Sequence, residues 1–249
     1  MLLNGKTALV TGCNRGIGKA ILETFAENGA NIFACVRNET EEFTDRIKSL
    51  SEKNNVEITP LYFDMRDEKA MKNAMMSIRK TRKKIDILVN NAGMRPPSAC
   101  SFQMTPIDKI REVFDVNFFA TLQLTQYVLK FMQDSGSIIN VASMAAFDGD
   151  LGFCAYSSSK AALIGFTRNL SRELGKQNIR VNAIAPGLTD TDMGRANNIN
   201  GNAENFIKES TLGRWGNPEE VANSILFLAS DLSSFVTGEV IFVNGGQRI

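Results

Sequence analysis

Histidine is absent from the 249 residues of the chain. This absence excludes Ser-His-Asp and Cys-His nucleophilic machinery, and it excludes any metal site that needs an imidazole ligand. If the chain is an acid–base enzyme, its protons must move through tyrosine, lysine, cysteine or carboxylate side chains.

Cysteine is scarce, because the chain has only four, at positions 13, 35, 100 and 154, with no C-x-x-C pair. Such spacing favours neither a zinc site nor a disulfide framework, and it suits a reducing compartment. Gly5 and Lys6 interrupt the N-terminus before an apolar run typical of a signal peptide can form. No segment approaches the ~18 consecutive apolar residues of a membrane-spanning helix. We therefore expect a cytoplasmic protein with no bound metal and no membrane partner.

An excess of charge of one sign is also lacking. Lys and Arg together number 28 and Asp and Glu 27, so the formal net charge is +1. The one basic run, from Arg79 to Lys84, is typical of a solvated helix C-terminus, where cations suit the helix dipole. Neither feature attracts nucleic acid in general, and we expect no nucleic-acid partner.

What the chain has is a regular alternation of strand-like and helix-like segments. Strands are expected at residues 7–12, 30–36, 56–64, 85–93, 137–143, 179–187 and 238–246, and helices at 16–29, 39–54, 67–83, 106–132, 156–174 and 218–230. Continuous apolar strands that alternate with helices indicate a parallel sheet covered on both faces. The sequence therefore predicts one α/β domain over residues 1–249, of Rossmann type and doubly wound, with a seven-stranded, mostly parallel sheet.

Residues 188–217 are the one long stretch without a clear pattern, and they are rich in Asn, Gly and Thr. A segment of this length inside a compact domain is more typical of a functional loop than of a connector. We expect it to be a mobile lid over a substrate.

The stretch TGCNRGIG follows the first expected strand and opens the first expected helix. Glycines allow a tight turn and close backbone approach, and the N-terminus of a helix attracts a pyrophosphate. This pattern predicts nucleotide binding, with contacts from Gly12, Asn14, Arg15, Gly16, Ile17 and Gly18.

The end of the second strand indicates which dinucleotide would bind. An acid there would take the ribose hydroxyls of NAD, whereas an arginine accommodates a 2′-phosphate. The stretch ACVRNE places Arg37 at this point with no acid at the strand end, and Arg15 lies in the glycine turn. Two guanidiniums suit a phosphate, which favours NADP(H) over NAD(H). The alternative is that Arg37 is a solvent-facing loop residue, with Glu39 beside it.

The stretch AYSSSKAAL places Tyr156 four residues before Lys160, which puts both on one face of a helix. Hydride reduction of a ketone builds negative charge on oxygen, and a positioned acid must protonate it. A free tyrosine has a pKa of about 10. We expect the Lys160 ammonium, together with the positive charge of an oxidised nicotinamide, to lower the pKa of Tyr156. Ser143, after the fifth strand, is expected to hydrogen-bond the substrate oxygen.

These motifs occur together in a known order. The segments TGCNRGIG, NNAG (90–93), FDVN, Ser143, YSSSK and PGLTDT (from Pro186) resemble the short-chain dehydrogenase/reductase family over essentially the whole chain. Within the family the chain is most similar to 3-oxoacyl-[acyl-carrier-protein] reductases. The resemblance implies a catalytic tetrad of Asn117, Ser143, Tyr156 and Lys160, with Asn117 and Lys160 in a water-mediated proton relay. Without it, Asn117 is interpreted as a capping or kink-stabilising residue.

The resemblance also implies further cofactor contacts. Lys160 would bind the nicotinamide ribose, Asp64 and Met65 would lie near the adenine, and Thr189 would hold the carboxamide. The remaining contacts implied in the cofactor cleft are Asn91, Ala92, Gly93, Pro186 and Gly187.

Three functions remain open at this point. The first is an NADPH-dependent ketoreductase of a 3-oxoacyl thioester, and the second is a dehydrogenase or reductase of a sugar or other polar alcohol. The third is a non-catalytic NADP(H) sensor. Whether an acyl-carrier protein is a partner stays open. Docking of an acidic carrier calls for basic residues near the entrance of the site, and Lys176 is the only basic residue in the segments 132–137 and 175–178. The helices 106–132 and 156–174 carry many apolar residues, and the resemblance implies that they pack against a second subunit, so we expect a homotetramer.

Overall fold

The computed structural model describes residues 1–132, 135–196, 207 and 210–247. Seven strands form one sheet in the order β3-β2-β1-β4-β5-β6-β7. All six strand pairings are parallel, so the predicted sheet is confirmed and is parallel throughout. The strands are β1 (Thr7–Thr11), β2 (Asn31–Val36), β3 (Ile58–Tyr62), β4 (Ile87–Asn90), β5 (Gly136–Val141), β6 (Ile179–Pro186) and β7 (Val240–Val243).

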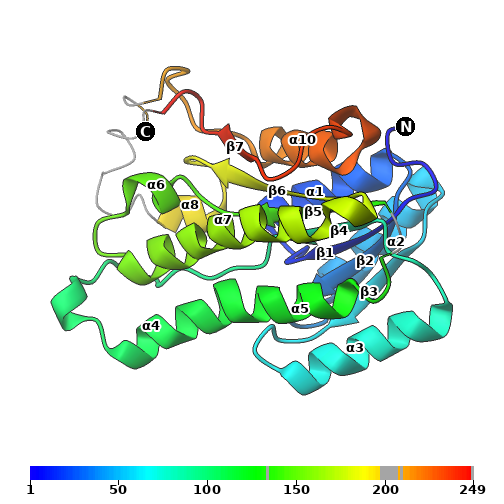
Figure 1. Ribbon diagram of the computed structural model, residues 1–249, viewed down its shortest axis with the longest axis horizontal. Coiled ribbons are helices and arrows are strands. Elements are labelled where there is room, and N and C mark those ends of the chain that lie inside the picture. The colour runs from blue at the N-terminus through cyan, green and yellow to red at the C-terminus, as the bar shows by residue number, and fades with distance from the viewer. Residues whose placement is uncertain (133–134, 197–206, 208–209, 248–249) are drawn as a thin grey trace.

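Helices cover both faces of the sheet (Figure 1). One face packs against α1 (Gly16–Glu27), α2 (Glu41–Asn54) and α10 (Pro218–Ala229). The other face packs against α3 (Glu68–Thr81), α5 (Ala120–Val128) and α7 (Cys154–Leu174). The doubly wound arrangement that the alternating pattern predicts is therefore present. No helix of the described residues is long and apolar enough to cross a membrane.

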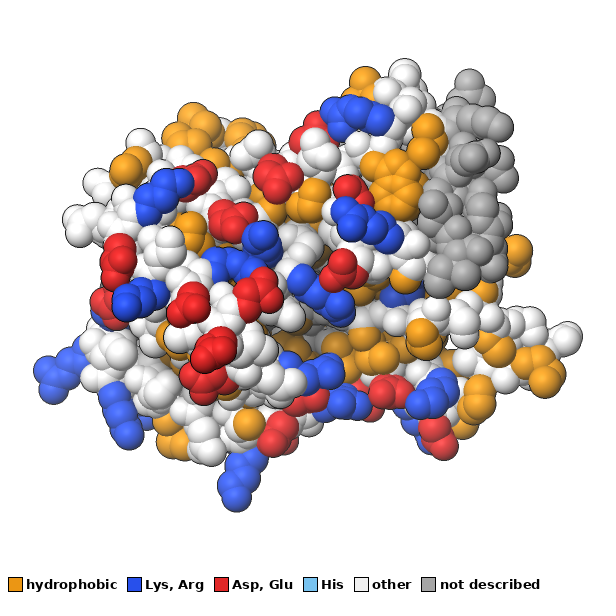
Figure 2. Space-filling view, turned by 180° about the vertical axis from the view of Figure 1, so that it is seen from behind, with side chains coloured by type: hydrophobic (Ala, Val, Ile, Leu, Met, Phe, Trp, Pro, Cys, Tyr) orange, Lys and Arg blue, Asp and Glu red, His pale blue; other side chains and the backbone are white. Residues whose placement is uncertain are grey.

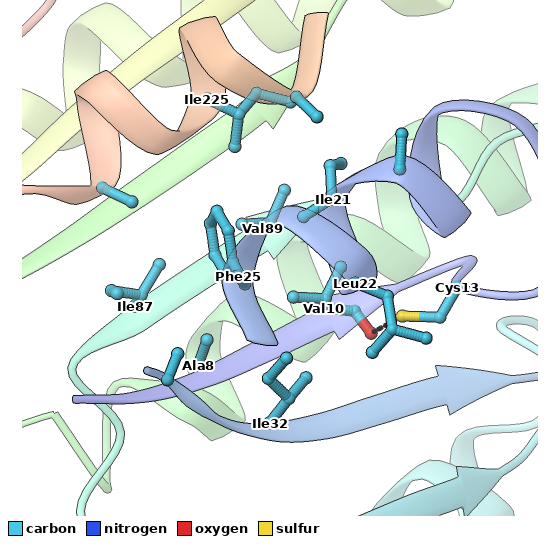
Figure 3. Packing of buried hydrophobic residues seen from close by; sticks show 14 of the residues in the cluster. Ala8, Val10, Cys13, Ile21, Leu22, Phe25, Ile32, Ile87, Val89 and Ile225 are labelled. Carbon is cyan, nitrogen blue, oxygen red and sulfur yellow. Dashed lines mark hydrogen bonds between the residues drawn. The ribbon is translucent and has the colours of Figure 1, made fainter. Parts of the chain in front are cut away.

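The two cores explain why the strands are apolar at nearly every position. Successive side chains of a strand point to opposite faces, so Val10 joins one core and its neighbour Leu9 joins the other. Figure 3 shows Val10 of β1 next to Leu22 of α1, on the face that α10 also covers. Burial on both faces leaves the carboxyl ends of the strands as the edge where polar side chains and loops gather.

The helix predicted over 106–132 differs in detail. It is divided into α4 (Ile107–Phe114), a π-helical turn η2 (Asp115–Phe119) and α5, which ends at Val128. A π turn holds one more residue per hydrogen-bonded ring than an α turn, and it often marks a functional position. Asn117 lies in the middle of this turn.

The structure describes both ends of the segment predicted to be a lid. Thr189 pairs with Gly216 in an isolated parallel bridge, and α8 (Asp192–Ala196) follows the first of these residues. The central part of the predicted lid, residues 197–206 and 208–209, lies outside the described residues.

Candidate active site

A large cavity opens at the carboxyl ends of the strands, with a volume of about 2200 Å³. Common ligand pockets have roughly 300–1,000 Å³, so this cavity has room for a dinucleotide and a second molecule together. Its walls come from the loops after all six strands from β1 to β6. Ligands of open parallel sheets bind at this edge.

The glycine turn after β1 forms one end of the cavity. Gly12 and Gly16 have φ values of +74° and +52°, which favour glycine. A Cβ on Gly18 would lie 1.9 Å from the carbonyl oxygen of Gly12, which is closer than two non-bonded atoms can approach. The turn therefore requires glycine for backbone conformation and for close contact, as the sequence pattern indicates.

The N-terminus of α1 faces this turn. Its N-cap residue, Arg15, makes no side-chain cap hydrogen bond, and the first turn contains no acid. In contrast, α2 and α3 begin with capping side chains, Thr40 and Asp67. The exposed amide groups and the helix dipole make the start of α1 suited to an anion such as a pyrophosphate.

Thr11 is a residue of this end that sequence reasoning missed. Its hydroxyl accepts hydrogen bonds from the backbone amides of Asn91 (3.0 Å) and Ala92 (2.9 Å) and donates to the carbonyl of Val89. The Asn91 side chain in turn donates to the Thr11 carbonyl at 2.8 Å. These bonds join the ends of β1 and β4, and a threonine directly before the first glycine is the only signal in the sequence.

The two arginines expected to bind a phosphate both line the cavity, but each pairs with a different carboxylate. Arg15 lies 3.4 Å from Asp192 of α8, and Arg37 lies 3.3 Å from Asp64. The distance in each case joins a guanidinium nitrogen to a carboxylate oxygen. Arg37 lies on the cavity wall, but its side chain is 60% exposed, so its position agrees with both the phosphate-binding prediction and the alternative of a solvent-facing loop residue.

Asp64 was predicted to lie near the adenine, but it is not among the residues that line the large cavity. Its carboxylate instead accepts hydrogen bonds from Arg66, at 2.8 Å from the backbone amide and 3.0 Å from the guanidinium. These bonds, followed by the charge of Arg37, lower the pKa of Asp64. Its neighbours Phe63 and Met65 do line the cavity, and the adenine contact of Asp64 stays a prediction.

Three of the four expected catalytic residues meet on the wall at the other end. Tyr156 and Lys160 are buried on α7, and Ser143 follows β5. The Lys160 ammonium donates to the carbonyl of Val141 at 2.7 Å, and it lies 5.9 Å from the centroid of the Tyr156 ring. The i, i+4 spacing therefore brings the two side chains to one place, as expected.

The predicted lowering of the pKa of Tyr156 rested on Lys160 together with the charge of an oxidised nicotinamide, and the chain's own groups alone do not produce it. Burial raises the pKa of Tyr156, while a hydrogen bond with Ser143 and the charge of Arg95 act in the opposite direction. Burial also lowers the pKa of Lys160 to about 8. For Tyr156, the effect of burial thus outweighs the hydrogen bond with Ser143 and the charge of Arg95.

Asn117 lies behind the wall rather than on it, and it is fully buried. Its side-chain amide donates to the carbonyl of Met94 (2.9 Å) and to Ser159 Oγ (3.0 Å), and its oxygen accepts from the Met94 amide (2.7 Å). A Cβ on Gly93 would lie 3.2 Å from Lys160 Nζ and 3.3 Å from Asn117 Oδ1. Asn117 therefore fixes the loop after β4 and ties it to α7. Ser159, for which the sequence analysis gives no role, completes this link.

The remaining residues that were predicted to contact the cofactor also line the cavity, and their contacts with it stay predictions. These residues are Asn14, Ile17, Met65, Ala92, Gly93, Pro186, Gly187 and Thr189.

Comparison with known proteins agrees with this geometry. A family model described as Enoyl-(Acyl carrier protein) reductase matches residues 12–248. The chain is 40% identical to a 3-oxoacyl-[acyl-carrier-protein] reductase of Aquifex aeolicus over 98% of each chain.

Two solved structures show the same fold over nearly their full length. A short-chain dehydrogenase/reductase from Serratia marcescens has a TM-score of 0.91 at 28% identity, with all of both chains covered. A putative NAD(P)-dependent gluconate 5-dehydrogenase from Beutenbergia cavernae, with bound NADP at low occupancy, has a TM-score of 0.90 at 32% identity, and the match covers 98% of this chain and 97% of that one. The chain belongs to the short-chain dehydrogenase/reductase family of NAD(P)-dependent oxidoreductases.

Proposed function

We propose that the protein is an NADPH-dependent carbonyl reductase whose substrate is a 3-oxoacyl thioester. The observation that carries the proposal is that Ser143, Tyr156 and Lys160 line the same cavity as the uncapped start of α1 and Arg37. One cavity thus offers an anion site and a proton donor. The 40% identity to a 3-oxoacyl-[acyl-carrier-protein] reductase supports the choice of substrate.

The residues on the wall fit a dinucleotide. The start of α1 would hold the pyrophosphate, and Arg15 and Arg37 would hold a 2′-phosphate, since no acid ends β2. Lys160 would bind the nicotinamide ribose, and Thr189 the carboxamide. When bound, NADPH supplies the hydride. The NADP found in the Beutenbergia cavernae structure supports this cofactor.

The chain's own residues supply the proton and hold the developing charge. The raised pKa of Tyr156 keeps its hydroxyl protonated, which is the form that donates a proton to the substrate oxygen. Ser143 donates a hydrogen bond to the same oxygen and stabilises it as charge develops. The Lys160 ammonium faces Tyr156 and stabilises the tyrosinate that remains. Asn117 holds Met94 and α7 in place, and with Lys160 it would relay a proton from solvent.

NADPH oxidation assayed against an acetoacetyl thioester and a panel of keto-sugars tests the substrate. We expect turnover of the thioester with the higher kcat/KM. Turnover of a keto-sugar together with no turnover of the thioester would reject the thioester assignment.

The second candidate is a dehydrogenase or reductase of a polar alcohol such as a sugar derivative. It is favoured by two charged side chains on the wall, Arg95 and Asp150, and by the structural neighbour described as a gluconate 5-dehydrogenase. The same assay separates the two candidates, because each predicts a different best substrate.

The carrier of the acyl chain is a separate question. Figure 2 shows Lys or Arg intermixed with Asp or Glu over the face opposite to the view of Figure 1. Among the described residues of that face there is no extended basic surface for an acidic carrier protein. A comparison of KM for a small free thioester with KM for the same acyl group on an acyl-carrier protein tests for docking. We expect a small difference.

We further propose a cytoplasmic homotetramer in which residues 188–217 act as a substrate lid. Two exposed apolar side chains, Ile107 of α4 and Phe119 of the η2 turn, support burial against a second subunit. The bridge between Thr189 and Gly216 ties the two ends of the lid together. Sedimentation as a monomer at micromolar concentration would contradict the tetramer.

A further inference from the structure

A buried ion pair lies on the cavity wall next to Tyr156, and the reaction described above does not use it. Arg95 donates to an Asp150 carboxylate oxygen at 2.7 Å, and the two side chains are only 10% and 22% exposed. The Arg95 guanidinium carbon lies 3.4 Å above the centroid of the Phe153 ring and 6.0 Å from the centroid of the Tyr156 ring. All four residues line the cavity.

Both halves of the pair are held in place by backbone contacts. The residue before Arg95 is Met94, whose amide and carbonyl both bind the Asn117 side chain. Asp150 lies in a turn closed by a 2.8 Å bond from the Phe153 amide to the Asp150 carbonyl. The carbonyl of Gly152 in this turn accepts from the Cys100 amide at 2.9 Å. The guanidinium and the carboxylate are therefore preorganised at the catalytic end of the cavity.

The donors of Arg95 exceed the acceptors around it. Arg95 Nε is buried and has no hydrogen-bond partner among the described residues. A guanidinium has five N–H donors, and one Asp150 oxygen takes a single Nη2 donor. A buried donor without an acceptor is costly, so a ligand oxygen placed beside Arg95 would gain affinity.

We propose that Arg95 and Asp150 form a specificity element that binds a substrate carrying a second, uncharged carbonyl next to the one that is reduced. Arg95 donates to that second carbonyl oxygen, as the thioester of a 3-oxoacyl thioester provides, while Asp150 disfavours a free carboxylate at the same position. This inference rests on the proposed function, and it specifies which group of the substrate faces which side chain.

The electrostatics favour the neutral acceptor. The pair has no net charge, so it attracts the dipole of a carbonyl but offers little to a full anion. A carboxylate bound by Arg95 would face Asp150 at close range, and like charges in a partly desolvated site repel strongly. The position of Arg95, 6.0 Å from the Tyr156 ring, suits an oxygen a few bonds from the oxygen that Tyr156 protonates.

The test compares three substrates in three variants: an acetoacetyl thioester, the anion acetoacetate, and a simple ketone without a second oxygen. Arg95→Gln should lower kcat/KM for the thioester about tenfold to a hundredfold more than for the simple ketone, mainly through KM, since a hydrogen bond to a charged group is lost. Asp150→Asn should raise the preference for acetoacetate over the thioester by about tenfold or more. Arg79→Gln, which removes an exposed arginine of α3, is the matched control.

Equal loss for thioester and simple ketone in Arg95→Gln, or unchanged acetoacetate preference in Asp150→Asn, would overturn the inference. If both variants lose folded structure, by circular dichroism, Arg95→Lys replaces Arg95→Gln, because it keeps the charge and loses the planar fork.

A binding measurement separates this inference from the proposed function. In the Tyr156→Phe protein with NADPH present, thioester affinity measured by calorimetry should fall about tenfold or more on adding Arg95→Gln. Weaker binding in the double variant, together with no turnover by the unchanged protein, would support the element and reject the reaction. Normal turnover with unchanged thioester affinity in the double variant would reject the element and keep the reaction.

Discussion

The two ends of the cavity are built from different parts of the chain. At the cofactor end, the part proposed to hold the pyrophosphate is built from backbone, with a glycine turn and an uncapped helix start within the single run from Thr11 to Gly18. The side chain of Arg37, after β2, adds the proposed contact to a 2′-phosphate. The catalytic end consists of side chains from separate segments, and its ion pair joins Arg95 to Asp150 across 55 positions of sequence.

This difference has a physical consequence. A backbone site depends on the space around the main chain, so a single added methyl group can destroy it while most side-chain changes leave it intact. A side-chain site depends on the groups themselves, so truncation removes the chemistry while the fold persists. Substitutions in the glycine turn should therefore change mainly the stability of the fold, and substitutions at the catalytic end should change mainly kcat.

The largest expected effect on activity is at the catalytic end. Tyr156→Phe removes the proton donor and should lower kcat by about 10²–10⁴-fold, the usual contribution of a general acid. NADPH affinity, measured by fluorescence titration, should change less than threefold, because the hydroxyl is not part of the anion site. Tyr127→Phe, on α5 and outside the cavity wall, is the control. Equal kcat values for Tyr156→Phe and Tyr127→Phe would show that the catalytic end is wrongly assigned.

The second prediction concerns the backbone of the cofactor end. Gly18→Ala places a Cβ 1.9 Å from the carbonyl oxygen of Gly12, and overpacking of this kind costs about 3 kcal/mol or more. Gly175→Ala, at a helical φ of −56° with nothing within 4 Å of the new Cβ, should instead stabilise by about 0.4–1 kcal/mol. Urea unfolding of both variants measures the difference, and equal stabilities would contradict the close contact.

The third prediction concerns cofactor choice. Arg37→Gln should raise KM for NADPH about tenfold to a hundredfold and leave KM for NADH nearly unchanged, because only NADPH carries the 2′-phosphate. Arg79→Gln on α3 is the control for the loss of one positive charge. A parallel rise of both KM values would mean that Arg37 acts on the shape of the site, not on the phosphate.

The smallest expected effect depends on pH. Burial lowers the pKa of Lys160 to about 8, so its ammonium form is lost as the pH rises through that value. Reductase activity should therefore fall on the alkaline side with an apparent pKa near 8. Lys160→Arg keeps the charge and should move this limb to higher pH, as a series of kcat/KM measurements would show.

The titration of Lys160 also changes the unfolding free energy of the protein. The pKa of Lys160 in the folded chain lies below its unfolded value of about 10.4, so between about pH 8 and 10.4 the unfolded chain binds more protons. The unfolding free energy therefore rises with pH through this window, and the cost of burying Lys160 is fully present below pH 8. Lys160→Met should remove this rise. If the difference in unfolding free energy between the unchanged protein and Lys160→Met did not vary from neutral to alkaline pH, the lowered pKa of Lys160 would be contradicted.

Most of the fold and the cofactor end could be predicted from the sequence because their signals are local. The alternation of strands and helices gave the parallel sheet, and the glycine spacing gave the turn and the start of α1. The spacing of Tyr156 and Lys160 placed both on one helix face within the cavity.

The remaining features depend on contacts between distant segments. The π turn at Asn117 is accompanied by bonds to Met94 and Ser159, and no local pattern encodes it. The direction of the pKa shift of Tyr156 depends on burial, which a motif does not report. The hydrogen bond from Arg66 to Asp64 could not be predicted either, because Arg66 lies in a loop whose conformation no local pattern in the sequence specifies.

Transfer of deuterium from NADPH labelled at the nicotinamide C4 tests the central claim most directly. With an acetoacetyl thioester, mass spectrometry of the product should find one deuterium on the new hydroxyl-bearing carbon, and Tyr156→Phe should lower its rate of appearance by about 10²–10⁴-fold. Tight NADPH binding without deuterium transfer to any thioester, ketone or keto-sugar would contradict the account and favour a non-catalytic NADP(H) sensor.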